Sequence, residues 1–462
     1  MRKRWAPALV AVAAASLLAG AAGQDKPQDR RKYLEPGTPV SDDPRRIPVR
    51  PGPRGPDGTL VLRGGRIFTG TGAPPSEGTL VIERNKIAKL LPPGSTDWPR
   101  DARVIDVAGK FVMPGMIDLH THLTYPLTTG DFGVATSEAD AALRGAEKLR
   151  YFIESGITSV RDVGSQGLVT FRLKEWVAEN RIAGPRVFPA GKFITAEGGH
   201  STEGTPDNFI RLQDATRLAS GPDDWRLAVR EQFHNGADLI KLGSHFTFDE
   251  VKAAVEEAHA LGLKVTVDAE TFYIQRAVEA GADTIEHPLP RSEETIQLMA
   301  RKGVAADPTL IPYQIIFDEW GGYFGSTSRR FTFSKEANLE MLRRLKRAGI
   351  KCGIGTDLIL HWYRYLPGAY IQEMKNFVAA GWSIPEVLAI ATKTNSEILD
   401  MNDRLGTLEP GRLADVVVID GRPDQNLDDL ARVDLVIRDG YIVVRDRQIA
   451  PQPRPFVPMK AQ

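Results

Sequence analysis

The segment FVMPGMIDLHTH, residues 111–122, joins an apolar run to a His-x-His pair. The apolar part predicts a buried strand over residues 111–118. Side chains two positions apart on a strand point to the same side, so His120 and His122 can face one metal ion together. Imidazole suits zinc and its neighbours, and a hydrolytic zinc keeps one position open for water. The pair alone is equally compatible with two exposed histidines at a strand end, so the rest of the chain has to decide.

Seven more short apolar runs follow this strand, with helix patterns between several of them. We expect strands at residues 157–162, 187–190, 239–242, 265–268, 284–286, 304–307 and 352–355, and helices at residues 138–155, 248–261 and 333–348. Eight such units predict an α/β fold, a (β/α)8 TIM barrel over residues 113–403, with its chemistry at the C-terminal ends of the strands. The long connections at residues 191–221 and 310–332 are expected to shape the active site.

The two ends of the chain share a different sequence pattern, in which short apolar stretches alternate with turn residues. Short alternating strands are expected at residues 59–68 and 78–83, and again at residues 414–420 and 435–444. We therefore predict one small β-sandwich domain, built from residues 58–112 and 404–450, with the barrel inserted between them.

Residues 1–23 have the composition of a secretory signal peptide. Three basic residues precede an apolar stretch at residues 8–19, and small residues follow it. Residues 24–57 are rich in proline, arginine and aspartate, and are expected to form a linker. The prediction is a secreted or periplasmic protein with no membrane anchor after signal cleavage.

The net charge and the cysteine content limit the kinds of partner and site that the protein can have. The 462 residues carry a formal net charge of zero, which argues against nucleic acid or an anionic membrane as a partner. The single cysteine, Cys352, excludes an internal disulfide and a multi-cysteine zinc site. No repeat or heptad pattern indicates the oligomeric state, and a homo-oligomer is compatible with the sequence.

Polar residues stand at the ends of several predicted barrel strands. Lys241 ends the fourth strand, Asp268 and Glu270 follow the fifth, His287 follows the sixth and Asp357 follows the eighth. Any one of them alone is better explained as a salt bridge or a strand cap. Because the carboxyl ends of barrel strands meet at one mouth, the set predicts a site there, together with His120 and His122.

These motifs resemble the amidohydrolase superfamily of metal-dependent hydrolases, in particular the branch of imidazolonepropionase-like enzymes and Xaa-Pro or Xaa-Arg dipeptidases. The segments that carry the resemblance are residues 111–122, 156–164, 237–241, 280–287, 355–357 and 405–415. The resemblance implies a site for one or two zinc ions, with His120, His122 and Asp357 on the first and His287 on the second. It implies that Lys241, carboxylated by CO2, bridges the two metals. The implied metal ligands are thus His120, His122, Lys241, Asp268, His287 and Asp357.

The resemblance also implies catalytic roles for Asp357 and Lys241. Asp357 would take a proton from the metal-activated water and pass it to the leaving amine. For each residue a simpler interpretation stays open. Lys241 could be an unmodified lysine that neutralises a neighbouring carboxylate, and Asp357 could be a ligand only.

Asp268 departs from the family pattern. Related chains read Val-Thr-Val-His-Ala at this strand, whereas residues 265–269 read VTVDA. A carboxylate oxygen can bind zinc, and it suits manganese better than imidazole does. Three outcomes follow: a second site richer in oxygen, which Mn2+ could occupy, a site that works with one metal, or an inactive relative.

His200, His245 and Tyr273 are the candidate substrate-binding residues, because they follow barrel strands near the expected mouth. Each could equally be an ordinary loop residue or a support behind the site, and His259 is expected on the surface of a helix. The predicted substrate is a small-molecule amide, such as a dipeptide or an N-acyl amino acid cleaved as by a prolidase or carboxypeptidase. The alternatives are cyclic amide hydrolysis, as in imidazolonepropionase-like enzymes, and a degenerate non-catalytic barrel that binds a small molecule.

Overall fold

The computed structural model describes residues 55–127, 136–200, 202, 214–288, 292–321 and 334–451. The predicted signal peptide and nearly all of the predicted linker lie outside these residues. None of the helices in the described part of the chain is both long enough and apolar enough to cross a membrane.

The centre of the molecule is built from parallel strands in two sheets. One sheet has the order β6 (Met116–Thr121), β7 (Ile157–Asp162), β8 (Arg186–Pro189). The other has the order β10 (Thr216–Leu218), β9 (Phe193–Thr195), β11 (Leu239–Gly243), β12 (Lys264–Asp268), β13 (Thr284–Glu286), β14 (Ala305–Asp307). These strands are short and almost entirely buried, as expected for a parallel sheet covered by helices.

Backbone hydrogen bonds connect the two sheets on both sides. Asp238 N donates to Pro189 O, which links β11 to β8. On the other side, residues 351–357 run between β14 and β6: Gly353 N donates to Ala306 O, and Leu119 N donates to Ile354 O. Together with the alternating helices, this arrangement confirms the predicted (β/α)8 barrel class.

Residues 352–355 differ from the predicted eighth strand. They form no regular strand, and only one β-bridge joins Cys352 to Ala306. The reason is crowding. A Cβ on Gly355 would lie 2.7 Å from His120 Cβ, and one on Gly353 would lie 2.9 Å from Ile398 Cδ1. The backbone of this segment therefore packs directly against β6, and a side chain at Gly353 or Gly355 would prevent such close packing.

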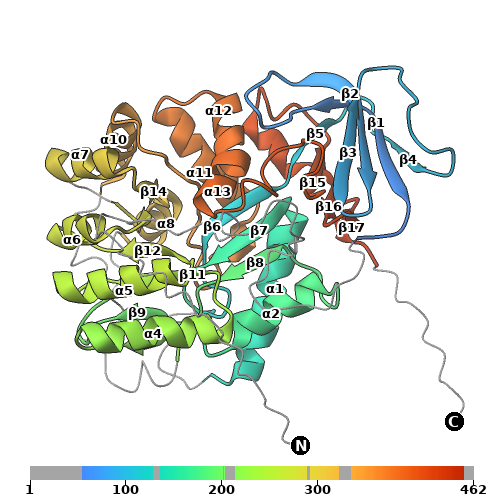
Figure 1. Cartoon of the computed structure of the whole chain (residues 1–462). Helices are drawn as coiled ribbons and strands as arrows, with labels where there is room; N and C mark the ends of the chain where they lie inside the picture. The colour runs from blue at the N-terminus through green and yellow to red at the C-terminus, as the bar shows by residue number, and fades with distance from the viewer. Residues whose placement is uncertain are drawn as a thin grey trace, which may run out of the picture.

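Helices cover the outside of the strands (Figure 1). In chain order they are α1 (Glu138–Glu154), α2 (Val169–Ala178), α4 (Pro222–Asn235), α5 (Phe248–Ala260), α6 (Phe272–Ala280), α7 (Glu293–Lys302), α8 (Leu310–Trp320), α10 (Lys335–Arg347), α11 (Gly368–Ala379), α12 (Ile384–Ala389) and α13 (Asn395–Ile398). In α1, Ser137 caps the first turn, and Leu149, Phe152 and Ile153 are buried at helical spacing.

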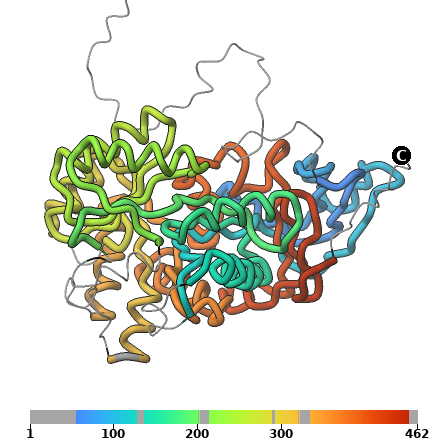
Figure 2. The backbone as a smooth tube through the Cα atoms, turned by 90° about the horizontal axis from the view of Figure 1, so that it is seen from below, coloured from blue at the N-terminus to red at the C-terminus, as the bar shows by residue number. Residues whose placement is uncertain are grey.

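The two ends of the chain meet in a third sheet, beside the barrel. Its strands are β1 (Thr59–Ile67), β2 (Ser76–Glu83), β3 (Lys86–Leu91), β4 (Arg103–Asp106), β5 (Phe111–Pro114), β15 (Val416–Ile419), β16 (Val433–Arg438), β17 (Tyr441–Arg445) and β18 (Gln448–Ile449). The central strand β5 pairs with β1 on one side and β15 on the other. Figures 1 and 2 show the blue and red ends of the chain lying together on one side of the barrel.

Two further local predictions are wrong, those for residues 111–118 and for His259. The strand expected at residues 111–118 is two strands, β5 in the terminal sheet and β6 in the barrel, because the chain turns between the sheets at Gly115, where a Cβ would lie 2.7 Å from Thr158 Cβ. The connection at residues 191–221 contains β9 and β10, and that at residues 310–332 begins with α8. His259 is buried, with Nε2 2.9 Å from Asp283 Oδ2, because its side of α5 packs on the sheet.

Candidate metal centre

Three histidines at the strand ends each direct the same ring nitrogen, Nε2, toward the carboxylate of Asp357. His122 Nδ1 lies 2.8 Å from the carbonyl oxygen of Gly164, and His120 Nδ1 lies 2.6 Å from Glu286 Oε2. A carbonyl oxygen and an ionised carboxylate can only accept, so in both contacts the histidine nitrogen must donate. His287 Nδ1 contacts the Thr309 hydroxyl, which donates its own proton to Pro308 O. Each Nδ1 therefore carries the hydrogen, and each Nε2 presents its lone pair.

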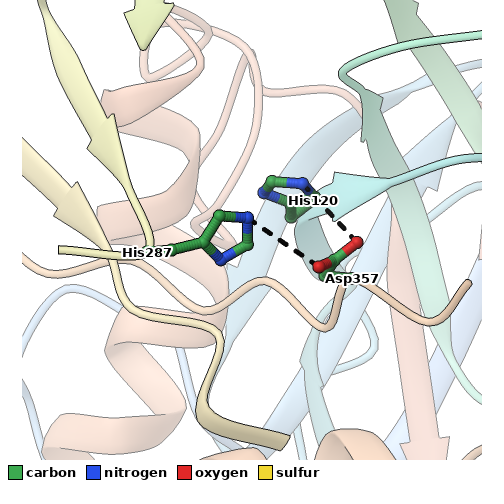
Figure 3. Close-up of side chains that lie close together, drawn as sticks. All are labelled: His120, His287 and Asp357. Carbon is green, nitrogen blue, oxygen red and sulfur yellow. Dashed lines mark ion pairs between the residues drawn. The ribbon is translucent and has the colours of Figure 1, made fainter. Parts of the chain in front are cut away.

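Asp357 lies among these lone pairs. Its Oδ1 is 3.7 Å from His120 Nε2 and 3.5 Å from His122 Nε2, and its Oδ2 is 3.8 Å from His287 Nε2. Figure 3 shows an ion pair from each of the His120 and His287 rings to the carboxylate of Asp357. One ligand atom from each of these three residues lies within 4.8 Å of the others.

The protonation states suit a cation. Burial, and secondly the positive charge of Lys241, hold the pKa of His120 well below its usual value, and burial lowers the pKa of His122 to about 3. Burial raises the pKa of Asp357, and Asp268 adds to this shift while Lys241 opposes it. Without a cation, the centre therefore holds neutral imidazoles beside a carboxyl group that resists ionisation. A divalent cation would stabilise the ionised carboxylate.

The distances fit a metal ion at the first position. His120 Nε2 and His122 Nε2 are only 3.3 Å apart, and both are unprotonated, so they cannot share a hydrogen bond. Two ligands each about 2.1 Å from a tetrahedral zinc ion are separated by about 3.4 Å. The three separations among His120, His122 and Asp357, 3.3, 3.5 and 3.7 Å, bracket that value. A divalent cation would relieve the repulsion between the lone pairs.

Lys241 and Asp268 reach the same region from neighbouring strands. Lys241, on β11, is 2% exposed and forms no hydrogen bond or ion pair with the residues that the structure describes. Asp268, at the end of β12, is 3% exposed, and its Oδ2 is 3.9 Å from His287 Nε2. The structure thus brings all six predicted metal ligands to one end of the barrel.

A buried charge network lies behind His120. Arg161, on β7, donates to Glu286 Oε1 at 2.6 Å and to Asp307 Oδ2 at 3.2 Å. Burial alone would raise the pKa of Glu286, but Arg161 and His120 outweigh it, and the pKa falls well below its usual value. His120, Glu286 and Asp307 also place one possible ligand atom each within 4.8 Å of the others. The Arg161 guanidinium, however, already supplies the positive charge beside Glu286 and Asp307. This group therefore orients His120 and is not a second candidate metal site.

The predicted substrate residues lie at the rim and pair with acids. His200 Nε2 is 3.1 Å from Asp268 Oδ2, and His245 Nε2 is 3.3 Å from Glu270 Oε1. Tyr273 makes an edge contact with the ring of His245, with 5.1 Å between the centroids. His200 and His245 are partly exposed, so both can meet a molecule that enters the mouth.

Sequence reasoning missed several residues that support the ligands. Glu286 precedes His287 directly and Arg161 lies inside a matching motif, so both had a signal in the sequence. Thr309 and Tyr125 had none: Thr309 orients His287, and Tyr125 stacks on His122 with 4.2 Å between the ring centroids. Only the packing of the loops onto the strand ends shows these contacts.

A separate small cavity lies at the opposite end of the strands. The first residues of three barrel strands, Leu239, Lys264 and Thr284, line it together with Asp400. It contains none of the predicted ligands. In barrels of this class the N-terminal end of the strands carries stability and the C-terminal end carries chemistry, so the metal centre is the functional candidate.

The chain is similar to known proteins in sequence and in structure. The model of the amidohydrolase family matches residues 111–443. An imidazolonepropionase from Fusobacterium nucleatum is 24% identical over 388 residues, covering 75% of this chain and 85% of that protein. A solved prolidase, complexed with N-methylphosphonate-L-proline, superposes with a TM-score of 0.76 at 29% identity, covering 84% of this chain and 100% of that one. A Xaa-Pro dipeptidase with bound methionine gives a TM-score of 0.75 at 26% identity, covering 83% and 99%. Since the family model spans more than half of the sequence, the chain belongs to the amidohydrolase family and is a metal-dependent hydrolase of carbon–nitrogen bonds.

Proposed function

We propose that this amidohydrolase cleaves the amide bond of dipeptides or N-acyl amino acids, with one or two divalent cations held at the mouth of its barrel. The observation that carries the proposal is the set of three Nε2 lone pairs directed at Asp357. His120, His122 and Asp357 would hold the first cation, and His287 and Asp268 would hold a second. Zinc suits the first position, and zinc or manganese suits the second, where Asp268 adds an oxygen.

A bound divalent cation supplies two kinds of chemistry here, because it acidifies a water molecule and polarises the scissile carbonyl. Asp357 would take a proton from the attacking water and pass it to the leaving amine. Its position supports this role, since its carboxylate faces His120, His122 and His287 while remaining 17% exposed to the mouth. Asp357 also has a left-handed backbone, with φ +46°, a strained conformation of the kind that clusters at active sites.

Lys241 would help to hold both cations as a carboxylated lysine formed with CO2. An ammonium cannot bind a cation, whereas its carbamate is an anion with two oxygen donors. Burying a charged ammonium without a partner is costly, and Lys241 is buried without one among the described residues. Loss of a proton from the ammonium, followed by addition of CO2 to the neutral amine with release of a second proton, would replace the buried cation with a carbamate anion that two cations could stabilise.

The relatives support small amide substrates of two kinds. The prolidase and the Xaa-Pro dipeptidase favour a dipeptide, and this chain matches each of them over nearly its full length. The imidazolonepropionase relative supports hydrolysis of a cyclic amide as the second candidate. The proposal includes export, based on residues 1–23, which favours an extracellular or periplasmic peptide over a substrate of cytoplasmic histidine breakdown.

Asp357→Asn tests the proposal. The variant keeps the shape of the side chain but removes the base, so kcat/KM on the best of a panel of dipeptides, N-acyl amino acids and cyclic amides should fall by at least about 100-fold. Its circular dichroism spectrum should match the wild type. Turnover at the wild-type rate would contradict the assigned role of Asp357. A wild-type protein that binds no divalent cation and hydrolyses none of the three classes would contradict the proposed function itself.

A further inference from the structure

His200 lies on the loop that follows β9, yet its ring is directed at a strand end. His200 Nε2 and Asp268 Oδ2 are 3.1 Å apart. The same oxygen is 3.9 Å from His287 Nε2. One oxygen of Asp268 therefore faces two imidazole nitrogens, one from the loop and one from the barrel.

The position of His200 is built into the fold. His200 N donates to Ser244 O, and Thr195 Oγ donates to the same carbonyl at 2.9 Å, so the loop is docked on the end of β11. Gly243 leaves room for the histidine, because a Cβ there would lie 3.2 Å from His200 Cβ. The ring of Phe193 lies 5.8 Å from that of His200, measured between centroids.

We propose that His200 is a ligand of the second cation, together with Asp268 and His287. The inference rests on the proposed function and adds one residue to its metal centre. The separations of 3.1 and 3.9 Å bracket the roughly 3.4 Å expected between two ligands of one tetrahedral zinc ion. The set supplies two nitrogens and one oxygen, and Asp357 Oδ2 lies 3.8 Å from His287 Nε2 on the other side.

The shorter side chain at residue 268 gives this arrangement a physical reason. An aspartate ends nearer to its own strand than a histidine would, so a cation bound to its carboxylate lies closer to β12 and to the loop that carries His200. The loop nitrogen then replaces the nitrogen that strand β12 does not provide. As a consequence, loading of the second position involves the loop after β9, whereas loading of the first does not.

Titration of the metal-stripped full-length protein with Zn2+, in competition with a chromophoric chelator, tests the inference. The wild type should bind two Zn2+ per chain. His200→Ala should bind the first with wild-type affinity and the second at least about 10-fold more weakly. His245→Ala is the matched control, because that histidine lies at the same rim but faces Glu270, and both affinities should stay unchanged.

His200→Gln separates a ligand from a positioning residue. Glutamine keeps an N–H donor for Asp268 but has no imidazole lone pair, so the second affinity should fall as in His200→Ala. Wild-type affinity in His200→Gln would overturn the inference, as would unchanged binding in His200→Ala or a single Zn2+ in the wild type. Each of these results leaves the first cation and the hydrolysis of amides intact, so failure of the inference is distinct from failure of the proposed function.

Discussion

His120 is held from both sides of its ring. Its Nε2 faces the metal centre, while its Nδ1 is 2.6 Å from Glu286, which Arg161 keeps ionised. A carboxylate behind a ligating histidine fixes the tautomer and raises the basicity of the ring. At the scale of single residues, the site thus depends on a buried acid as much as on the ligands themselves.

Glu286→Gln tests this dependence. The amide cannot stabilise the His120 tautomer as a carboxylate does, and it leaves Arg161 with less compensation. We expect the affinity for the first Zn2+ to fall by about 10- to 100-fold, as measured by chelator competition. Glu270→Gln is the control, because it removes a buried acid that pairs with His245 and not with a proposed ligand of the first cation. An equal loss in both variants would mean that net charge, and not ligand orientation, sets the affinity.

Glu373 makes stability depend on pH away from the metal centre. Its carboxyl oxygens accept the backbone N–H groups of Leu310 and Ile311 at the start of α8, yet full burial raises its pKa from 4.5 to about 7. The folded state therefore binds a proton between pH 4.5 and 7 that the unfolded chain has lost. The contribution of Glu373 to stability is complete below about pH 4.5 and declines as the pH rises through 7.

Glu373→Gln removes this titration. The stability advantage of the wild type over the variant should be larger at pH 5 than at pH 8, by up to about 3 kcal/mol for a shift of this size. Urea denaturation at the two pH values measures it. Glu336→Gln, on the exposed side of α10, should follow the wild type at both pH values. An advantage that grows from pH 5 to pH 8 would show that Glu373 is stabilised as a carboxylate.

At the scale of elements, the eighth barrel segment sets the spacing of the metal centre. Residues 351–357 carry Asp357 and run against β6, which carries His120, and Asp357 N donates to His120 O at 2.8 Å. Asp118, on β6, accepts from both the N–H and the hydroxyl of Thr356. Close backbone approach of these two elements therefore holds ligands that are far apart in sequence.

Gly355→Ala should disrupt this approach. The added Cβ would lie 2.7 Å from His120 Cβ and 2.8 Å from His120 N, where the backbone cannot yield easily. We expect a loss of about 1–3 kcal/mol in stability together with weaker binding of the first Zn2+. Gly368→Ala is the control, since nothing lies within 4 Å of a Cβ at the start of α11. Unchanged Zn2+ affinity in Gly355→Ala would separate the spacing of these elements from metal binding.

At the scale of the whole molecule, buried ion pairs join the terminal sheet to the barrel. Arg186, on β8, lies 3.2 Å from Asp415, which precedes β15, and Asp415 also accepts the N–H of Asp439 at 2.7 Å. All three residues are buried. The contact ties the two ends of the chain to the wall of the barrel.

Asp415→Ala should remove the carboxylate that lies 3.2 Å from the buried Arg186 guanidinium, whereas Asp439 lies 3.8 Å from it. Removing one partner of such a pair costs about 3–5 kcal/mol, so the urea midpoint should fall strongly. Asp420→Ala, at an exposed position just beyond β15, should stay within about 0.5 kcal/mol of the wild type. A small effect of Asp415→Ala would mean that the sheet and the barrel are held together by apolar packing.

The sequence by itself determined the elements with strong local patterns. The β7 and β13 strands match the predicted ranges in full, and α1 and α5 differ from theirs by one residue at the C-terminal end. Buried apolar runs and helix caps are local signals, which explains this agreement. The candidate ligands were also accessible, because side chains at the ends of parallel strands must meet at one mouth.

Only the tertiary structure decided how these residues act together. The break at Gly115 depends on how closely Thr158 approaches, and the irregular path of residues 352–355 depends on contact with β6. The contact of His200 with Asp268 joins a loop to a strand end 68 positions later in the chain, at 3.1 Å. Such contacts carry no periodicity in the sequence, because they arise from the distances between packed backbones. The His-x-His pair at residues 120–122 thus marked the site, and the packing around it determined which groups face it.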